Sequence, residues 1–264
     1  MTADLVHLPR LRQVAVVTRD RERVEADLVA MLDARLAERY PGVDQFGLGT
    51  AFYTLGNEFF EVVHAAVPGS VADRLIDRRG GDAGFIVMLE CDGLAAYEQR
   101  AAALGIRVVD RTRSANGSQV QFHPKDTGGI YLAVTEITAP GAGDDDGPWM
   151  YGGPSWRDGR GFEVVAGIIG AELACAEPLA VAARWSELLD LPWVPTGDGS
   201  AAMALRGGWL RFVSSTPGWP AGLVGVAVVS PNPREVRRRA HARRSVGADG
   251  SISLGGVRIV VTGT

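Results

Sequence analysis

Residues 84–109 have the sequence GFIVMLECDGLAAYEQRAAALGIRVV, in which a strand, a turn and a helix are expected in immediate succession. The run FIVMLEC is apolar except for Glu90, which is typical of a buried strand. Asp92 is placed to cap the helix LAAYEQRAAAL, and Gly105 is placed to end it. One helix beside a small sheet cannot bury its apolar face alone, so the chain should contain further units that pack together.

The same pattern occurs three more times along the chain. In residues 13–36 the strand QVAVVT leads to Asp20, a predicted helix cap. Apolar side chains then recur every four positions, at Val24, Leu28, Leu32 and Leu36. Residues 171–191 and 222–245 repeat the pattern with the strands ELACA and LVGVAVV. Short strands follow each helix: TAFYTLG and NEFFEVVH, QVQFHP and GGIYLAVTE, AAMALRGG and WLRFVSS, SISLGG and VRIVVTG. The sequence therefore predicts four modules, each a strand, a helix and two or three strands.

A stretch without periodicity separates the second module from the third. Residues 138–161, TAPGAGDDDGPWMYGGPSWRDGRG, are rich in Gly, Pro and Asp, a composition typical of a linker. We expect an N-terminal domain over residues 1–138, a linker over 139–161 and a C-terminal domain of two shorter modules over 162–264. Trp149 and Trp156 should pack on a domain surface, because indole rings are rarely left in water.

Composition narrows the class of partner. The 264 residues are 46% hydrophobic and carry 27 basic against 31 acidic side chains, a formal charge of −4. No strong positive field favours nucleic acid or an anionic membrane, and no run approaches the ~20 apolar residues of a spanning helix. We therefore expect a small-molecule ligand, no nucleic acid and no membrane, and a homodimer is compatible with the sequence.

The cysteines and the N-terminal sequence indicate a compartment. Cys91 and Cys175 lie far apart in apolar runs and are expected to be buried, reduced thiols. The N-terminal sequence MTADLVHLPRLRQ lacks the apolar core of a signal peptide. The expected location is the cytoplasm.

The order RQVAVVTRD, EFFEVVH, GFIVMLECDGLAAYEQRAAALGIRVV and FHPKDTGGIYLAVTE resembles the vicinal oxygen chelate superfamily, which contains glyoxalases, bleomycin-resistance proteins and extradiol dioxygenases. The first half, residues 11–137, is most similar to methylmalonyl-CoA epimerase-like sequences, through the HPKD-x-GG turn at residues 123–129. The second half resembles the superfamily through ELACAEPLAVAARWSELLDLP. The resemblance implies an α+β fold of four tandem βαβββ modules that form two incomplete barrels.

The resemblance also implies a metal site that this chain has lost. Superfamily members usually hold a divalent ion with one ligand from each first strand and one from each last strand. The corresponding positions of this sequence are Gln13, Glu61, Ile86 and Ala133. Isoleucine and alanine offer no donor atom, and a neutral amide is a weak ligand. We therefore expect no tightly bound metal cofactor, although a divalent ion held by atypical ligands is the less favoured alternative.

Period-two alternation predicts which side chains line the cleft. Gln13 should share a face with Phe59 and Glu61. The other half of the lining should be Ile86, Met88, Glu90, Tyr131 and Ala133. Burial disfavours the charged form of a carboxyl group and raises its pKa, so Glu61 is the candidate catalytic residue. The competing interpretations are that another group of the protein holds Glu61 and that Gln13 is a structural amide.

Two basic features have alternative interpretations. Lys125, in the HPKD turn, either meets an anionic group of a ligand or belongs to an exposed hairpin rim. The six arginines of residues 234–244 are compatible with a phosphate contact, but Val236 and Ala240 form an apolar seam that favours a solvated helix covering a sheet.

Three function classes remain open, and the sequence does not settle whether the protein is an enzyme. The favoured hypothesis is a glyoxalase- or bleomycin-resistance-like protein that binds a small, partly apolar ligand. The first alternative is an epimerase, isomerase or lyase that uses Glu61 on a carbonyl or acyl-CoA substrate, and the second is a metal-dependent enzyme of the superfamily. A scaffold role is a further option. Dioxygenase chemistry is disfavoured, because the third module offers Glu172 but no histidine.

Overall fold

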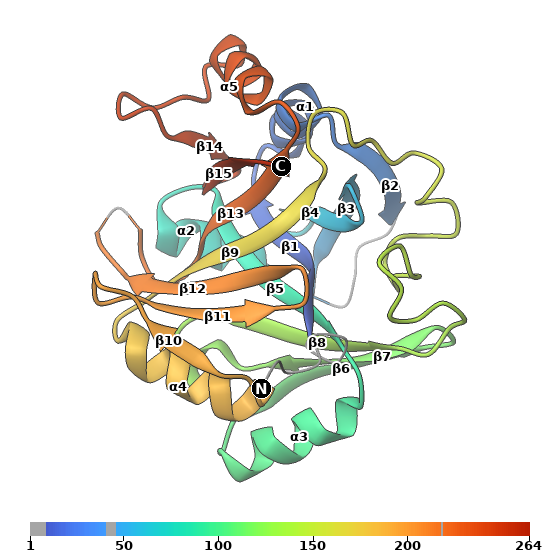
Figure 1. Cartoon of the computed structure of the whole chain (residues 1–264), viewed down its shortest axis with the longest axis vertical. Coiled ribbons are helices and arrows are strands. Elements are labelled where there is room, and N and C mark those ends of the chain that lie inside the picture. The colour runs from blue at the N-terminus through green and yellow to red at the C-terminus, as the bar shows by residue number, and fades with distance from the viewer. Residues whose placement is uncertain (1–8, 41–45, 218) are drawn as a thin grey trace. The chain divides into compact units, whose positions relative to one another are not determined.

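The computed structural model describes residues 9–40, 46–217 and 219–264 (Figure 1). Its elements follow one another as four modules. The first is β1 (Arg10–Thr18), α1 (Arg21–Leu32), β2 (Arg35–Tyr40), β3 (Leu48–Leu55) and β4 (Glu58–Ala65). Helix α2 (Val71–Arg79) leads to the second: β5 (Ala83–Cys91), α3 (Leu94–Ala103), β6 (Val108–Ser114), β7 (Gly117–Phe122) and β8 (Tyr131–Ile137). The third is β9 (Gly167–Cys175), α4 (Pro178–Leu189), β10 (Trp193–Pro195), β11 (Ala201–Leu205) and β12 (Gly208–Ser214). The fourth is β13 (Gly222–Ser230), α5 (Pro233–Ala242), β14 (Ile252–Leu254) and β15 (Val257–Gly263).

Two mixed sheets carry these modules. The first has the strand order β2-β3-β4-β1-β5-β8-β7-β6, and the second has the order β10-β11-β12-β9-β13-β15-β14. In each module the first strand pairs in parallel with the last: β1 with β4, β5 with β8, β9 with β12 and β13 with β15. The predicted α+β fold of tandem modules is confirmed. The fourth module differs in detail, because two strands, rather than three, follow its helix in the described part of the chain.

The chain also divides into two compact units. The inner unit comprises residues 1–12, 86–150 and 169–224, and therefore holds most of the second and third modules. The outer unit comprises residues 13–85, 151–168 and 225–264, and therefore holds most of the first and fourth modules. The sheets follow the order of the modules along the chain, whereas the compact units do not. The domain limits 1–138, 139–161 and 162–264 thus stay a prediction.

Two of the predicted helix ends need correction. The Asp20 side chain caps α1 by accepting a hydrogen bond from Arg23 N at 3.0 Å, as predicted. However, α1 ends at Leu32, because Asp33 adopts φ 58°, and Leu36 belongs to β2 with its side chain exposed. Asp92 does not cap α3. The N-cap is Gly93, with φ 66°, whose backbone N–H donates to Glu136 at 2.9 Å.

Each unit has its own core. In the outer unit, α1 packs against α5 and β4, and Val24 and Leu28 are fully buried. In the inner unit, α4 covers β11 and β12 with Trp185, whose ring meets Phe212 edge-on at 5.2 Å. The Trp185 indole N–H donates to the carbonyl of Thr127 at 3.2 Å, so its polar atom is satisfied despite full burial.

The two cysteines are free and buried, as predicted. Burial raises the pKa of Cys175 to about 11 and raises the pKa of Cys91 above its usual range as well. Separately, none of the helices in the described residues is long and apolar enough to span a membrane.

Candidate functional site

The candidate site in the outer unit is built on the parallel pair β1 and β4. Gln13 lies opposite Phe59 in this ladder, and Ala15 lies opposite Glu61. The Gln13 side-chain amide donates a hydrogen bond to a carboxylate oxygen of Glu61 at 2.7 Å. Both side chains are buried, with 0% of Gln13 and 6% of Glu61 exposed. The prediction that these residues share one strand face is confirmed.

Aromatic side chains surround this pair. Phe52 of β3 lies directly opposite Glu61, so the two side chains point to the same side of the sheet. Tyr151 stacks on the Phe52 ring with centroids 5.5 Å apart and planes 6° from parallel, and Tyr40 meets the same ring edge-on. The Phe59 ring meets Trp156 at 5.1 Å. The site is thus a buried amide and carboxylate set among apolar rings.

A second carboxylate lies in the same row of the sheet. Glu38 of β2 is the cross-strand neighbour of Phe52, which is in turn the neighbour of Glu61. Burial, then Glu38 and then Glu61 raise the pKa of the Tyr40 hydroxyl. Gly153, with φ 70°, lies so close to Glu38 that a Cβ atom there would be 2.4 Å from its carboxylate oxygen. The left-handed backbone at this position favours glycine.

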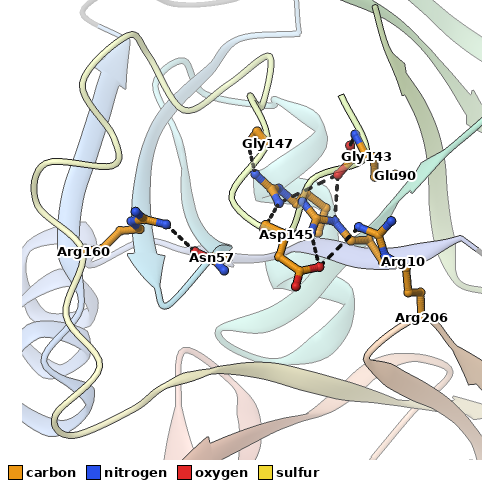
Figure 2. A network of polar contacts seen from close by, with 9 residues as sticks. Arg10, Asn57, Glu90, Gly143, Asp145, Gly147, Arg160 and Arg206 are labelled. Atoms are coloured by element: carbon orange, nitrogen blue, oxygen red, sulfur yellow. Dashed lines mark hydrogen bonds and ion pairs between the residues drawn. The ribbon is translucent and has the colours of Figure 1, made fainter. Parts of the chain in front are cut away.

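The predicted linker is anchored on both units. Trp149 is 3% exposed, and the Arg12 guanidinium lies over its ring at 5.7 Å in the inner unit. Trp156 is 2% exposed and packs on Phe59 in the outer unit. Arg160 donates to the side chain of Asn57 at 2.6 Å (Figure 2). The prediction that both tryptophans pack on protein surfaces is confirmed.

The other predicted lining residues lie in the inner unit. The register pairs Ile86 with Tyr131 and Met88 with Ala133, which places each pair on one face as predicted. Ile86, Met88 and Ala133 are buried, and Tyr131 is half-buried. The side chains of Ile86 and Ala133 are hydrocarbon and offer no ligand atom.

Glu90 has partners that the sequence did not reveal. Its carboxylate accepts a hydrogen bond from Arg10 at 2.8 Å, and Arg12 lies 3.8 Å away (Figure 2). The backbone N–H of Gly143 also donates to it at 3.4 Å. Glu90 thus belongs to a buried ion-pair network in the inner unit, and a role in ligand binding stays a prediction.

Lys125 lies on an exposed turn. The HPKD turn forms a short 3-10 helix, Pro124–Asp126, in which the His123 ring accepts a hydrogen bond from Lys125 N at 3.1 Å. Arg107 binds the Asp126 carboxylate through two side-chain nitrogens, each at 2.8 Å. These contacts fit the interpretation of the turn as a hairpin rim, whereas a contact of Lys125 with a ligand stays a prediction.

The arginine-rich helix α5 is solvated on one side. Val236 and Ala240 are fully buried, as the seam predicted. Hydrogen bonds from Arg238 and Arg239 lower the pKa of Glu235 to about 2. Two of the arginines of this helix are therefore paired with Glu235 in the same helix.

The donor set does not fit a tightly held divalent ion. Gln13 and Glu61 bind each other, and Ile86 and Ala133 have no donor. Within residues 9–40, 46–217 and 219–264, no group of three or more His, Cys, Asp or Glu side chains is arranged to hold a metal. Metal content itself stays a prediction.

The structure also brings together a cluster that sequence analysis missed, formed by Arg10, Arg12, Arg206, Glu90 and Asp145 (Figure 2). The sequence feature that could have indicated this cluster is RLR, residues 10–12, at the start of a buried strand. Alternation places two like charges on one strand face, and such a pair needs anionic partners.

Comparisons with known proteins show which folds this chain resembles. A scan against protein-family models finds no match. The structure is similar to a variant of 4-hydroxymandelate synthase from Streptomyces coelicolor, with a TM-score of 0.67 and 15% identity over 91% of this chain and 76% of that one. It is also similar to the Mn(II)-bound glyoxalase from Novosphingobium aromaticivorans, with a TM-score of 0.66 and 14% identity over 97% and 82%. Both likenesses are to the fold, and they agree with the predicted tandem arrangement of modules.

About half of the chain is also similar in sequence to an epimerase. A stretch of 139 residues is 26% identical to human mitochondrial methylmalonyl-CoA epimerase and covers 52% of this chain and 78% of that protein. The predicted similarity to methylmalonyl-CoA epimerase-like sequences is confirmed.

Proposed function

We propose that the protein binds a small, partly apolar molecule at the outer-unit face that carries Gln13 and Glu61, without a tightly held metal ion. The hydrogen bond between these two buried side chains, at 2.7 Å, carries the proposal. A buried amide and carboxylate can exchange their mutual bond for bonds to a polar ligand group at little net cost. Phe52 and Phe59 supply apolar contact beside them.

A second candidate is an epimerase, isomerase or lyase that acts on a carbonyl or acyl-CoA compound. Two observations favour it: the similarity to human methylmalonyl-CoA epimerase and the burial of Glu61. In this candidate the buried carboxylate of Glu61 would take a proton from the carbon next to the carbonyl. Gln13 would then orient the carboxylate through its amide N–H.

One set of proteins tests both candidates. Wild type, Glu61→Gln and the control Glu22→Gln are compared in calorimetric titrations with propionyl-CoA and 2-oxobutyrate. NMR in D2O measures deuterium exchange next to the carbonyl group. Glu22 is an exposed residue of α1, so its variant makes the same chemical change away from the site.

The outcomes separate the candidates. Exchange that is lost in Glu61→Gln, with binding retained, supports the enzyme. Saturable binding with no exchange in any protein supports the binding function. Elemental analysis of the purified protein should give much less than one equivalent of Mn, Fe, Co, Ni or Zn, and an equimolar metal would contradict the metal-free site.

A further inference from the structure

Three arginines converge in the inner unit. Arg10 and Arg12 point to the same side of β1 and are 5% and 0% exposed. Arg206 lies in the turn between β11 and β12, and its backbone N–H donates to the carbonyl of Pro9 at 3.1 Å. Glu90 is the buried carboxylate of this cluster, at 2.8 Å from Arg10. Three positive charges thus lie around one buried negative charge.

A short segment, Gly143–Gly147, crosses the cluster, and we call it the acidic strap. Its contacts with the arginines are mostly through backbone: the Asp145 carbonyl accepts from Arg10 at 2.8 Å and from Arg12 at 3.1 Å, and the Gly147 carbonyl accepts from Arg12 at 2.5 Å (Figure 2). The Asp145 side chain is 90% exposed. Its carboxylate lies 3.9 Å from Arg10 and 3.8 Å from Arg206, which is too far for a hydrogen bond.

Two guanidinium groups therefore keep unused donors. The Nη2 atoms of Arg10 and Arg206 are buried and have no hydrogen-bond partner among the described residues. Leaving a charged donor buried and unsatisfied costs more free energy than most single contacts return. Such a group in a folded protein calls for a partner that satisfies it.

We propose that the arginine cluster is a binding site for a small dianion that carries carboxylate or phosphate groups. Its oxygens accept hydrogen bonds from Nη2 of Arg10 and of Arg206, while the Asp145 side chain turns away into solvent. The planar fork of arginine suits both oxyanions. The acidic strap covers the site when the dianion is absent.

Calorimetric titrations at low salt with inorganic phosphate and, separately, with malonate test the proposal. Asp145→Asn removes the competing carboxylate and should bind the preferred probe several-fold more tightly than wild type. Arg206→Gln removes a charged donor and should bind about tenfold more weakly. Asp190→Asn and Arg111→Gln make the same chemical changes on exposed residues of the same unit outside the strap, and they should bind like wild type. The preferred probe distinguishes a phosphate from a dicarboxylate.

The proposal is overturned if neither probe binds saturably to wild type or to Asp145→Asn, or if Arg206→Gln binds as tightly as wild type. The Arg206 side chain is 22% exposed, so its replacement should leave the fold intact, and thermal unfolding of each variant checks this. Arg206→Lys keeps the charge but loses the fork, and it should bind with intermediate affinity. The Gln13–Glu61 site is unaltered in every variant, so the two proposals fail independently.

Discussion

Asp126 shows how a single carboxylate holds together a turn that contains candidate ligand-binding residues. It accepts three hydrogen bonds from Arg107, one from the backbone N–H at 3.0 Å and two from the guanidinium group at 2.8 Å. These bonds lower the pKa of Asp126 far below its ordinary value. The ionised carboxylate is therefore the form that stabilises the folded protein.

We expect Asp126→Asn to lower the melting temperature at pH 7 by about 1–3 °C, because the Arg107 side chain is 58% exposed and solvent screens its pair with Asp126. The pH dependence of this loss of stability follows from the lowered pKa of Asp126. The stabilisation is complete at pH values above the unfolded pKa of about 3.9 and fades as the pH falls towards the folded pKa. The difference between variant and wild type should shrink steadily below pH 4 in thermal unfolding followed by circular dichroism. A difference that grows as the pH falls would contradict this assignment, and Asp158→Asn, at an exposed position, is the control.

The contacts of the arginine cluster could not be predicted from the residues next to each arginine in the sequence. Strand alternation was enough to place Gln13 and Glu61 on one face. The partners of Arg10 lie 80 and 135 residues away along the chain, at Glu90 and Asp145. A pattern of neighbouring residues carries no information about contacts at such separations. The run of acids at residues 144–146 therefore looked like an ordinary solvated linker.

At the element scale, apolar strands were predictable and charged ones were not. The buried strands of the parallel pairs have long apolar runs, so β1, β5 and β8 could be found from sequence. The strand β2, RLAERY, carries three charged side chains at the edge of its sheet, and its composition does not signal a strand. Helix α2 was also missed, although Ser70 caps it by accepting a hydrogen bond from Asp73 N at 3.2 Å.

The two aspartates predicted as caps give a matched test. Asp20→Ala should destabilise the protein by about 1 kcal/mol, since it removes the hydrogen bond that starts α1. Asp92→Ala should cost less than half as much, because the N-cap of α3 is Gly93 and no side chain caps this helix. Urea unfolding at pH 7 measures both. Equal losses would show that Asp92 supports its helix after all.

At the scale of the whole molecule, the compact units join modules that are distant in sequence. Helix α1 of the first module packs against α5 of the fourth. Arg243 of the residues just after α5 donates to the buried carboxylate of Asp27 at 2.7 Å. The composition of the linker does not predict that the first and fourth modules pack together, because their packing depends on which surfaces the modules bury against each other.

A double-mutant cycle should detect that pairing. Asp27→Asn, Arg243→Gln and the double variant are compared in urea unfolding. We expect a coupling free energy of roughly 0.5–1 kcal/mol, since the Arg243 side chain is 40% exposed and solvent weakens the pair. In a control cycle, Arg244→Gln takes the place of Arg243→Gln. Arg244 is the exposed residue next to Arg243, and we expect no coupling between Arg244 and Asp27. Additive effects for Asp27 and Arg243 would contradict a joint stabilisation of the two helices.

The grouping of modules in the outer unit has a consequence for synthesis on the ribosome. Helix α1 is made early, but α5 follows it by about 200 residues, which takes roughly 10–40 s at the usual 5–20 residues per second. All segments of the inner unit precede residue 225, so that unit can be completed while the outer unit still lacks residues 225–264. During this interval α1 lacks α5, one of the elements against which it packs in the folded protein. A ribosome that pauses late in translation therefore leaves the Gln13–Glu61 half of the protein unfinished.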